Sequence, residues 1–348
     1  MASDVVAAGH ARGVAVVVVA SEGRTLCGAA GSAHHDGAAM RVDSACNWFS
    51  MTKIATATTA ALLADRGELD LDAPVAHYLG DVWPAGSTAT VRQLLGHRAG
   101  LRNPLPIRWV HPAADPMPDQ REFLARLMSR QAQPKWEPGS RAAYSNVSYL
   151  AIGEVIAAAT GRPLDDVIID ELLVPLGMRD TAFRWDRLDG RPAASGYHPT
   201  LRGLGPLLGR MLPAGVVGER VGRDITLLPF EVDGAAYGGL IGSALDASRL
   251  LALHVDRGAV GGRQLITERS IVEMTDIAPS GGPREFGLGW FRATGDTSGR
   301  VEHLGGGMGF WNVMRFDPVR AIGAVVMSNT TRHWDISDAA DRAIALLG

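Results

Sequence analysis

Apolar runs at the two ends of the chain predict the strands of one sheet. Near the N-terminus, residues 14–21 and 24–31 are rich in small and β-branched side chains and flank Glu22-Gly23, which predicts a β-hairpin. Toward the C-terminus four further strand-like runs follow, at residues 286–292, 301–304, 311–316 and 321–327. We expect the first and last runs to pair in one antiparallel sheet.

Helical periodicity is clearest between Ser50 and Arg66. Apolar and small side chains recur at helical spacing from Ile54 to Leu62, and Gly67 directly after Arg66 supplies a stop signal. Further helices are predicted at residues 121–130, 147–160, 247–256 and 335–347.

The order of these elements predicts an α/β (α+β) fold, with an antiparallel sheet flanked by helices and split by an all-helical insertion. Residues 1–80 and 226–348 would form the α/β domain, and residues 81–225 the mainly helical domain. The weakly patterned stretch 185–229 is long for a loop in a compact domain, so we expect it to serve a site, as a lid would.

Composition narrows the classes of function. The chain has 348 residues, 46% of them hydrophobic, and a net charge of −3, which gives no basic field for nucleic acid or an anionic membrane. The longest apolar run is too short to span a bilayer, and the first residues lack a basic signal-peptide region. Two cysteines give no metal spacing. We therefore expect a cytoplasmic protein without metal or cofactor, acting on a small molecule.

The candidate chemistry begins at Ser50-Met51-Thr52-Lys53. Residues three apart lie on the same face of a helix, so the amine of Lys53 can reach the hydroxyl of Ser50. Serine needs an adjacent base to act as a nucleophile, and lysine can be that base where burial favours its neutral form. The pattern alone arises often by chance, so its weight depends on motifs elsewhere.

Two motifs later in the chain supply side chains that could act together with Ser50 and Lys53. In Tyr144-Ser145-Asn146 the first and third side chains would point into one cleft, while Ser145 caps the following helix. A tyrosine hydroxyl can relay a proton, and an asparagine amide both donates and accepts hydrogen bonds. In His303-Leu304-Gly305-Gly306, the glycines at the end of a strand would let a ligand lie against it.

Together, Ser-x-x-Lys, Tyr-x-Asn and His-x-Gly resemble the serine β-lactamase and penicillin-binding-protein superfamily, in particular its class C branch. Three further segments are similar to stretches of that family, at residues 94–101, 136–139 and 238–243. His97, in the first of these segments, is expected to be structural.

The resemblance implies a β-lactamase/transpeptidase-like fold and assigns roles. Ser50 would be the acylated nucleophile, Lys53 its base, and Tyr144 the proton shuttle to the leaving group. Asn146 would hold Lys53 and a substrate carbonyl, and the backbone N–H groups of Ser50 and Gly306 would form the oxyanion hole. His303, Gly305 and Trp311 are the remaining candidates for substrate contact, with Trp311 lining an acyl pocket.

The sequence departs from the motifs of β-lactamases and transpeptidases at two positions, and these differences change the activity that we expect. His303 replaces the cationic residue that meets a substrate carboxylate in β-lactamases and transpeptidases, and an unperturbed histidine is largely neutral at pH 7. The His-x-Gly motif is most similar to that of the family VIII carboxylesterases. Phe49 stands before the serine where glycine is common in the class C branch, and its ring could narrow the pocket.

We therefore predict a carboxylesterase that hydrolyses small esters through an acyl-enzyme on Ser50. The same motifs are compatible with a D-amino-acid amidase or peptidase, and with a biosynthetic acyltransferase or peptide cyclase. β-Lactam hydrolysis and a non-catalytic ligand-binding module are disfavoured, the latter because a pure binder has no need for the serine, lysine and tyrosine together. The sequence leaves the natural substrate and the oligomeric state open.

Overall fold

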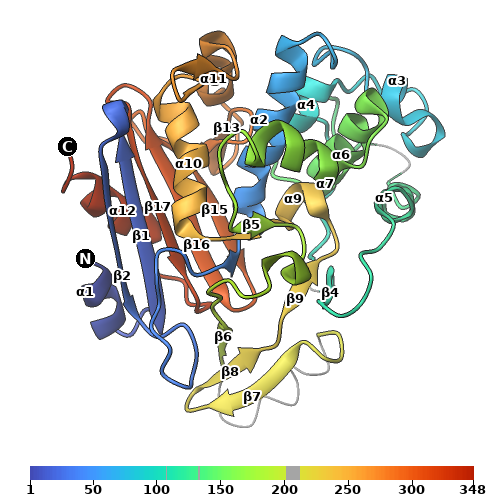
Figure 1. Cartoon of the computed structure of the whole chain (residues 1–348). Coiled ribbons are helices and arrows are strands. Elements are labelled where there is room, and N and C mark those ends of the chain that lie inside the picture. The colour runs from blue at the N-terminus through green and yellow to red at the C-terminus, as the bar shows by residue number, and fades with distance from the viewer. Residues whose placement is uncertain (107, 132–133, 201–211) are drawn as a thin grey trace.

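A seven-stranded antiparallel sheet runs through the molecule (Figure 1). The computed structural model describes residues 1–106, 108–131, 134–200 and 212–348. The strands lie in the order β13 (Arg284–Phe286), β14 (Phe291–Ala293), β15 (Val301–Gly307), β16 (Phe310–Asp317), β17 (Ile322–Ser328), β1 (Gly13–Ala20) and β2 (Thr25–Gly31). Val14 pairs with Ser328 and Ala20 with Ile322, which confirms that the two ends of the chain share one sheet.

Strand β1 is buried on both faces, which explains why its sequence is a continuous apolar run. Val14, Val16 and Val18 pack toward α12 (Ile336–Ile344) and α1 (Ala2–Ala7). The alternate residues, such as Val17, face α10 (Ala244–Val255) and join the main core. The sheet is therefore the middle layer between two sets of helices (Figure 1).

The main helical layer lies against one side of the sheet (Figure 1). Its central helix, α2 (Thr52–Asp65), is buried over nearly its whole length and contacts α6 (Asn146–Thr160) and α9 (Ala235–Gly238). Gly67 follows its end as predicted, and its N–H donates to the carbonyl of Ala64. The other helices of this region are α3 (Ala76–Leu79), α4 (Val91–Leu95), α5 (Gln120–Met128), α7 (Leu164–Ile168) and α11 (Glu268–Thr275).

The predicted strand at 286–292 is in fact a hairpin. Strands β13 and β14 pair antiparallel, with Phe286 opposite Phe291, and residues 287–290 form the turn. Gly289 has φ +82°, a conformation that favours glycine, so the chain reverses here instead of extending. The apolar side chains on both sides of the turn gave the run its strand-like appearance.

The insertion at 81–225 contains strands as well as helices, so it is not all-helical as expected. Short strands link it to later parts of the chain in three small antiparallel sheets. The sheets are β3 (Cys46–Asn47) with β10 (Ile241–Gly242) and β5 (Thr181–Ala182); β4 (Val110–Pro112) with β9 (Phe230–Val232); and β6 (Gly196–Pro199) with β8 (Asp224–Leu227) and β7 (Val217–Val221). A fourth ribbon pairs β11 (Ala259–Val260) with β12 (Arg263–Gln264). Strands of two to five residues are too short to show a period in the sequence.

The stretch 185–229, expected as a weakly patterned loop, holds all three strands of the β6-β8-β7 sheet. Residues 201–211 of that stretch lie outside the described residues, and the proposal of a lid rests partly on them. Among the residues that the structure describes, no helix is both long and apolar enough to cross a membrane.

Candidate active site

Ser50 lies in a 3-10 turn, Phe49–Met51, that leads directly into α2. Phe49 has φ +50°, a left-handed conformation that is unusual for a bulky side chain. Its ring packs 6.1 Å from that of Phe230 and 6.4 Å from that of Phe310, measured between ring centroids. These contacts hold the strained residue and so fix the position of Ser50, which is half-buried.

Lys53 lies in the first turn of α2, and its amine has three oxygen partners. The Nζ atom is 3.1 Å from Oγ of Ser50, 2.9 Å from Oδ1 of Asn146 and 2.8 Å from the backbone oxygen of Tyr237. The last two oxygens can only accept, so they take two N–H groups. A neutral amine has one remaining position, its lone pair, and that position faces Ser50.

Burial lowers the pKa of Lys53 well below its ordinary value. The side chain is fully buried, and among the described residues its three hydrogen-bond partners include no carboxylate. The rings of three tyrosines, 144, 149 and 237, lie within 5.5 Å of Nζ and keep water away from it. The site therefore favours the neutral amine that can accept a proton from Ser50.

Tyr144 also contacts the hydroxyl of Ser50. Its hydroxyl donates a 2.7 Å hydrogen bond to Oγ of Ser50. Burial raises the pKa of Tyr144 to about 12, against a smaller opposing effect of the Ser50 hydrogen bond, so the phenol keeps its proton at neutral pH. Ser145 caps α6 as predicted, with its hydroxyl accepting from the N–H of Ser148.

His97 supports this tyrosine segment. Its Nδ1 accepts a hydrogen bond from the N–H of Ser145, and its ring lies 4.8 Å from that of Tyr144. Burial lowers the pKa of His97 well below its ordinary value, and the proximity of Lys53 and His303 adds to the effect. Its contacts make it a structural support for Tyr144, in keeping with the sequence-based expectation that it is structural.

His303 does not lie where the sequence-based interpretation placed it. Its side chain is 1% exposed and packs 5.0 Å from the ring of Phe291, behind Tyr144, instead of facing the cavity beside Ser50. The Nδ1–H donates to the backbone oxygen of Gly289 at 2.7 Å. Burial, with help from Lys53, lowers the pKa of His303 to about 3, so the imidazole is neutral. The turn after β13 supplies the carbonyl that holds it there.

The glycines after His303 allow strand β15 to approach the serine turn. A Cβ added at Gly305 would collide with the backbone oxygen of Trp48, and one at Gly307 would collide with the ring of Phe49. Gly306 faces the cavity that also contains Ser50. This arrangement is compatible with the oxyanion hole expected from the N–H groups of Ser50 and Gly306.

The cavity at Ser50 has a volume of about 410 Å³ and a predominantly apolar wall. Of the predicted site residues, Ser50, Asn146, Gly306 and Trp311 line it. Lys53, Tyr144, His303 and Gly305 lie behind this surface. Among the described residues, the lining contains no Asp, Glu, Lys or Arg; its other members are Phe49, Pro106, Trp109, Val110, His198, Leu212, Val232, Tyr237, Gly307, Met308, Thr331 and His333.

Sequence reasoning missed two residues that hold the site together. The carbonyl of Tyr237 accepts from Lys53 and its ring lines the cavity, while Oδ1 of Asn103 accepts from the N–H of Asn146 at 2.8 Å. Tyr237 directly precedes the Gly238-Gly239 segment used for the resemblance, so its position was the available signal. Asn103 lies in an irregular segment and gave none. Across the described part of the chain, no group of three or more His, Cys, Asp or Glu side chains could hold a metal ion.

Curated proteins similar to this chain include D-alanyl-D-alanine carboxypeptidases. A D-alanyl-D-alanine-carboxypeptidase/endopeptidase, AmpH, of Escherichia coli (strain K12) is 28% identical over 177 residues, covering 50% of this chain and 46% of AmpH. A putative D-alanyl-D-alanine carboxypeptidase of Salmonella enteritidis PT4 is 25% identical over 270 residues, covering 70% of this chain and 57% of the relative. The chain thus spans about half the length of these curated relatives.

Solved structures show the same fold. An octameric penicillin-binding protein homologue from Pyrococcus abyssi matches with a TM-score of 0.80 and 23% identity over 99% of this chain and 75% of that one. The D-amino acid amidase from Ochrobactrum anthropi SV3 matches with a TM-score of 0.79 and 24% identity over 99% and 96%. The family model described as Beta-lactamase matches residues 1–348. The chain therefore belongs to the beta-lactamase family of serine hydrolases.

Proposed function

We propose that the protein is a carboxylesterase that hydrolyses small, uncharged esters through an acyl-enzyme on Ser50. The observation that carries the proposal is the character of the cavity beside Ser50. Its described lining is predominantly apolar and contains no Asp, Glu, Lys or Arg. His303, at the position where a cation is common, is buried and neutral. A carboxylate on the substrate would lose its hydration there without gaining a Lys or Arg partner among the described lining residues.

In the proposed mechanism, Oγ of Ser50 attacks the ester carbonyl carbon while Nζ of Lys53 takes the hydroxyl proton. The developing oxyanion is held by the backbone N–H groups of Ser50 and Gly306; each such donor commonly contributes ~10²–10³ in rate. The C–O bond to the alcohol then breaks, and the proton reaches the leaving oxygen through the hydroxyl of Tyr144. Water adds to the acyl-enzyme by the same route and releases the acid and Ser50.

The short distances from Ser50 to both partners support this route. Oγ is within 3.1 Å of Nζ of Lys53 and 2.7 Å of the hydroxyl of Tyr144, so a proton can pass from one to the other across the serine oxygen. The hydrogen bonds from Lys53 to Asn146 and Tyr237 orient the amine. These groups would act on an ester or an amide alike, so the substrate class rests on the cavity.

The test compares a neutral ester, an amide and a β-lactam on the same preparation. We expect kcat/KM for p-nitrophenyl butyrate to exceed that for D-phenylalanine amide and for nitrocefin by at least about 100-fold, which corresponds to about 2.7 kcal/mol of differential transition-state binding. Ser50→Ala should abolish all hydrolysis above background. Ester hydrolysis that survives in this variant would exclude the acyl-enzyme, and a preference for the amide would replace the esterase assignment by an amidase.

A further inference from the structure

A cluster of charged side chains, of which His111 and Glu231 are buried, lies on the back of one wall of the cavity. Strands β4 and β9 pair with Val110 opposite Val232 and His111 opposite Glu231. Val110 and Val232 line the cavity. Because side chains alternate between the two faces of a strand, His111 and Glu231 face away from it. The two-stranded ribbon thus has an apolar front toward the substrate space and a charged back.

The charges on the back of the ribbon contact one another closely. Nδ1 of His111 lies 2.7 Å from Oδ1 of Asp233, and its Nε2 lies 3.4 Å from Oε2 of Glu231. The guanidinium of Arg184 lies 3.6 Å from the same Glu231 oxygen. The Glu231 side chain is 0% exposed, and besides these two contacts its Oε1 accepts from the N–H of Trp185 at 3.0 Å.

The protonated form of His111 is the one that the cluster favours. Burial alone would lower the pKa of His111, but the hydrogen bond to Asp233 and the contact with Glu231 outweigh it and raise the pKa to about 9. Below that pH, the imidazolium and the guanidinium face three carboxylates: Glu231, Asp233, and Asp186, which lies 3.1 Å from Arg184. Above it, Glu231 and Asp233 lose the positive charge that lies between them, and an uncompensated buried charge is strongly destabilising.

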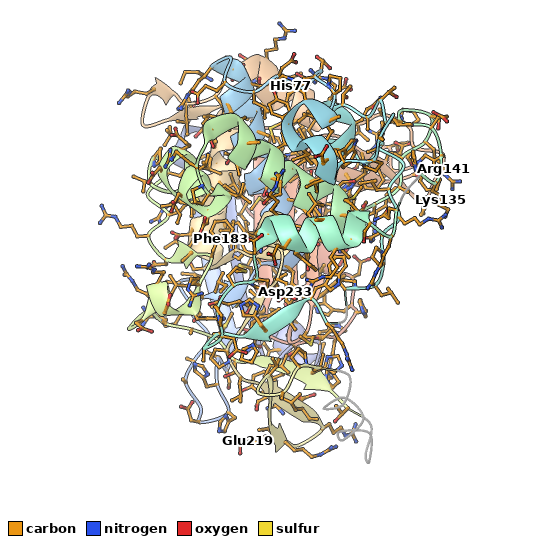
Figure 2. All side chains as sticks on the ribbon, turned by 90° about the vertical axis from the view of Figure 1, so that its right-hand side faces the viewer. His77, Lys135, Arg141, Phe183, Glu219 and Asp233 are labelled. Atoms are coloured by element: carbon orange, nitrogen blue, oxygen red, sulfur yellow. The ribbon has the colours of Figure 1, made fainter. Side chains whose placement is uncertain are left out.

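The cluster is also connected to the catalytic lysine. The N–H of Asp233 donates to the carbonyl of Trp109, a cavity residue, at 3.0 Å. Gln120 donates to the backbone oxygen of Asp233 and accepts from the N–H of Ala235, the first residue of α9. The same short helix contains Tyr237, whose carbonyl accepts from Lys53. Figure 2 shows Asp233 beside the short strand β4.

We propose that His111 is a positioning residue, which holds the β4–β9 wall in the shape that binds substrate by bridging Glu231 and Asp233. The inference rests on the proposed function, because it takes this cavity as the ester site. Loss of the bridge should weaken binding while leaving the chemistry at Ser50 largely intact. The effect should therefore fall on KM and inhibition constants more than on kcat.

The experiment follows inactivation by diethyl p-nitrophenyl phosphate, a neutral ester that would phosphorylate Ser50, from pH 6.5 to 10. The label is detected by mass, and the binding constant KI is separated from the maximal rate kinact. Affinity for Nile red, a neutral apolar dye, is measured in parallel by fluorescence. In the wild-type protein we expect KI and the dye Kd to rise at least about fivefold across pH 9, with no matching step in kinact.

Two variants test whether His111 causes the rise in KI and dye Kd across pH 9. His111→Gln alone removes the positive charge between Glu231 and Asp233, so it is paired with Asp233→Asn in a double variant that removes one charge of each sign and should show no step. His35→Gln is the matched control, because Nε2 of His35 lies 2.8 Å from Glu219 in an exposed pair on the β7 side of the molecule, away from Asp233 (Figure 2). This control should keep the wild-type step.

Two results would overturn the inference: a wild-type KI and dye Kd that stay constant through pH 9, or a step that persists in the double variant. Failure of the phosphate ester to label Ser50 is a separate outcome. It would contradict the proposed function, while the dye measurement would still decide whether His111 positions the wall.

Discussion

At the scale of single residues, the site depends on the protonation state of Lys53. The amine donates to two oxygens that can only accept, and its third position faces Ser50. Full burial makes the charged form unfavourable and lowers the pKa. Spacing therefore brings the two groups together, but desolvation is what would make the lysine a base.

Replacement of this amine tests the assignment directly. Lys53→Met keeps the length and apolar stem of the side chain but removes the base, so we expect kcat/KM for p-nitrophenyl butyrate to fall by ~10²–10⁴. The melting temperature should stay the same or rise, because a buried amine is replaced by an apolar group. A variant with near wild-type turnover would show that another group deprotonates Ser50.

At the scale of elements, strand β15 packs against the turn Phe49–Met51, and the contact is made between Gly307 and the ring of Phe49. The ring of Phe49 occupies the space into which a Cβ at Gly307 would project. Phe49 also adopts φ +50°, which a glycine would adopt without strain. The pair thus determines how closely the oxyanion side of the cavity approaches Ser50.

A double-mutant cycle measures this fit. Gly307→Ala should lower kcat/KM at least about tenfold, because the added methyl group displaces the ring next to Ser50 and shifts the strand. Phe49→Gly should enlarge the cavity and shift the ester preference toward longer acyl chains. The combination should recover most of the activity lost in Gly307→Ala. Additive losses would indicate that the two positions act independently.

At the scale of the whole molecule, a buried histidine joins the helical layer to the sheet. His254 in α10 lies 3.1 Å from the hydroxyl of Thr58 in α2 and 5.2 Å from the ring of Trp290. Burial lowers the pKa of His254 to about 3, below its unfolded value of about 6.5. The unfolded chain therefore binds a proton first as the pH falls.

This difference predicts a loss of stability in mild acid. Above pH 6.5 the imidazole is neutral in both states, and its contribution to stability is complete. Between about pH 6.5 and 3 protonation favours the unfolded chain, by about 2 kcal/mol at pH 5. His254→Gln keeps a hydrogen-bond donor without a titrating group, so its urea unfolding free energy should fall less between pH 8 and 5. Equal slopes for both proteins would contradict the pKa shift.

The prediction of the fold from sequence succeeded where the pattern was long. The hairpin 14–31, the helix after Ser50 and the C-terminal strands have apolar runs or periods that span several residues, and their pairing followed from the order of elements. The hairpin at 284–293 and the strands of the insertion are too short to show a period, and they exist because distant segments pair with them.

The sequence by itself determined that Ser50 and Lys53 share a helix face and that Ser145 caps the next helix, because these are relations between near neighbours. Only the tertiary structure decided that Lys53 is fully buried and that His303 lies behind Tyr144. It also decided that a predominantly apolar cavity opens at Ser50, with His111 on the far side of one wall. The solvation and the charge state of a side chain depend on groups from distant segments, and the spacing of residues along the chain does not predict which distant groups will be neighbours.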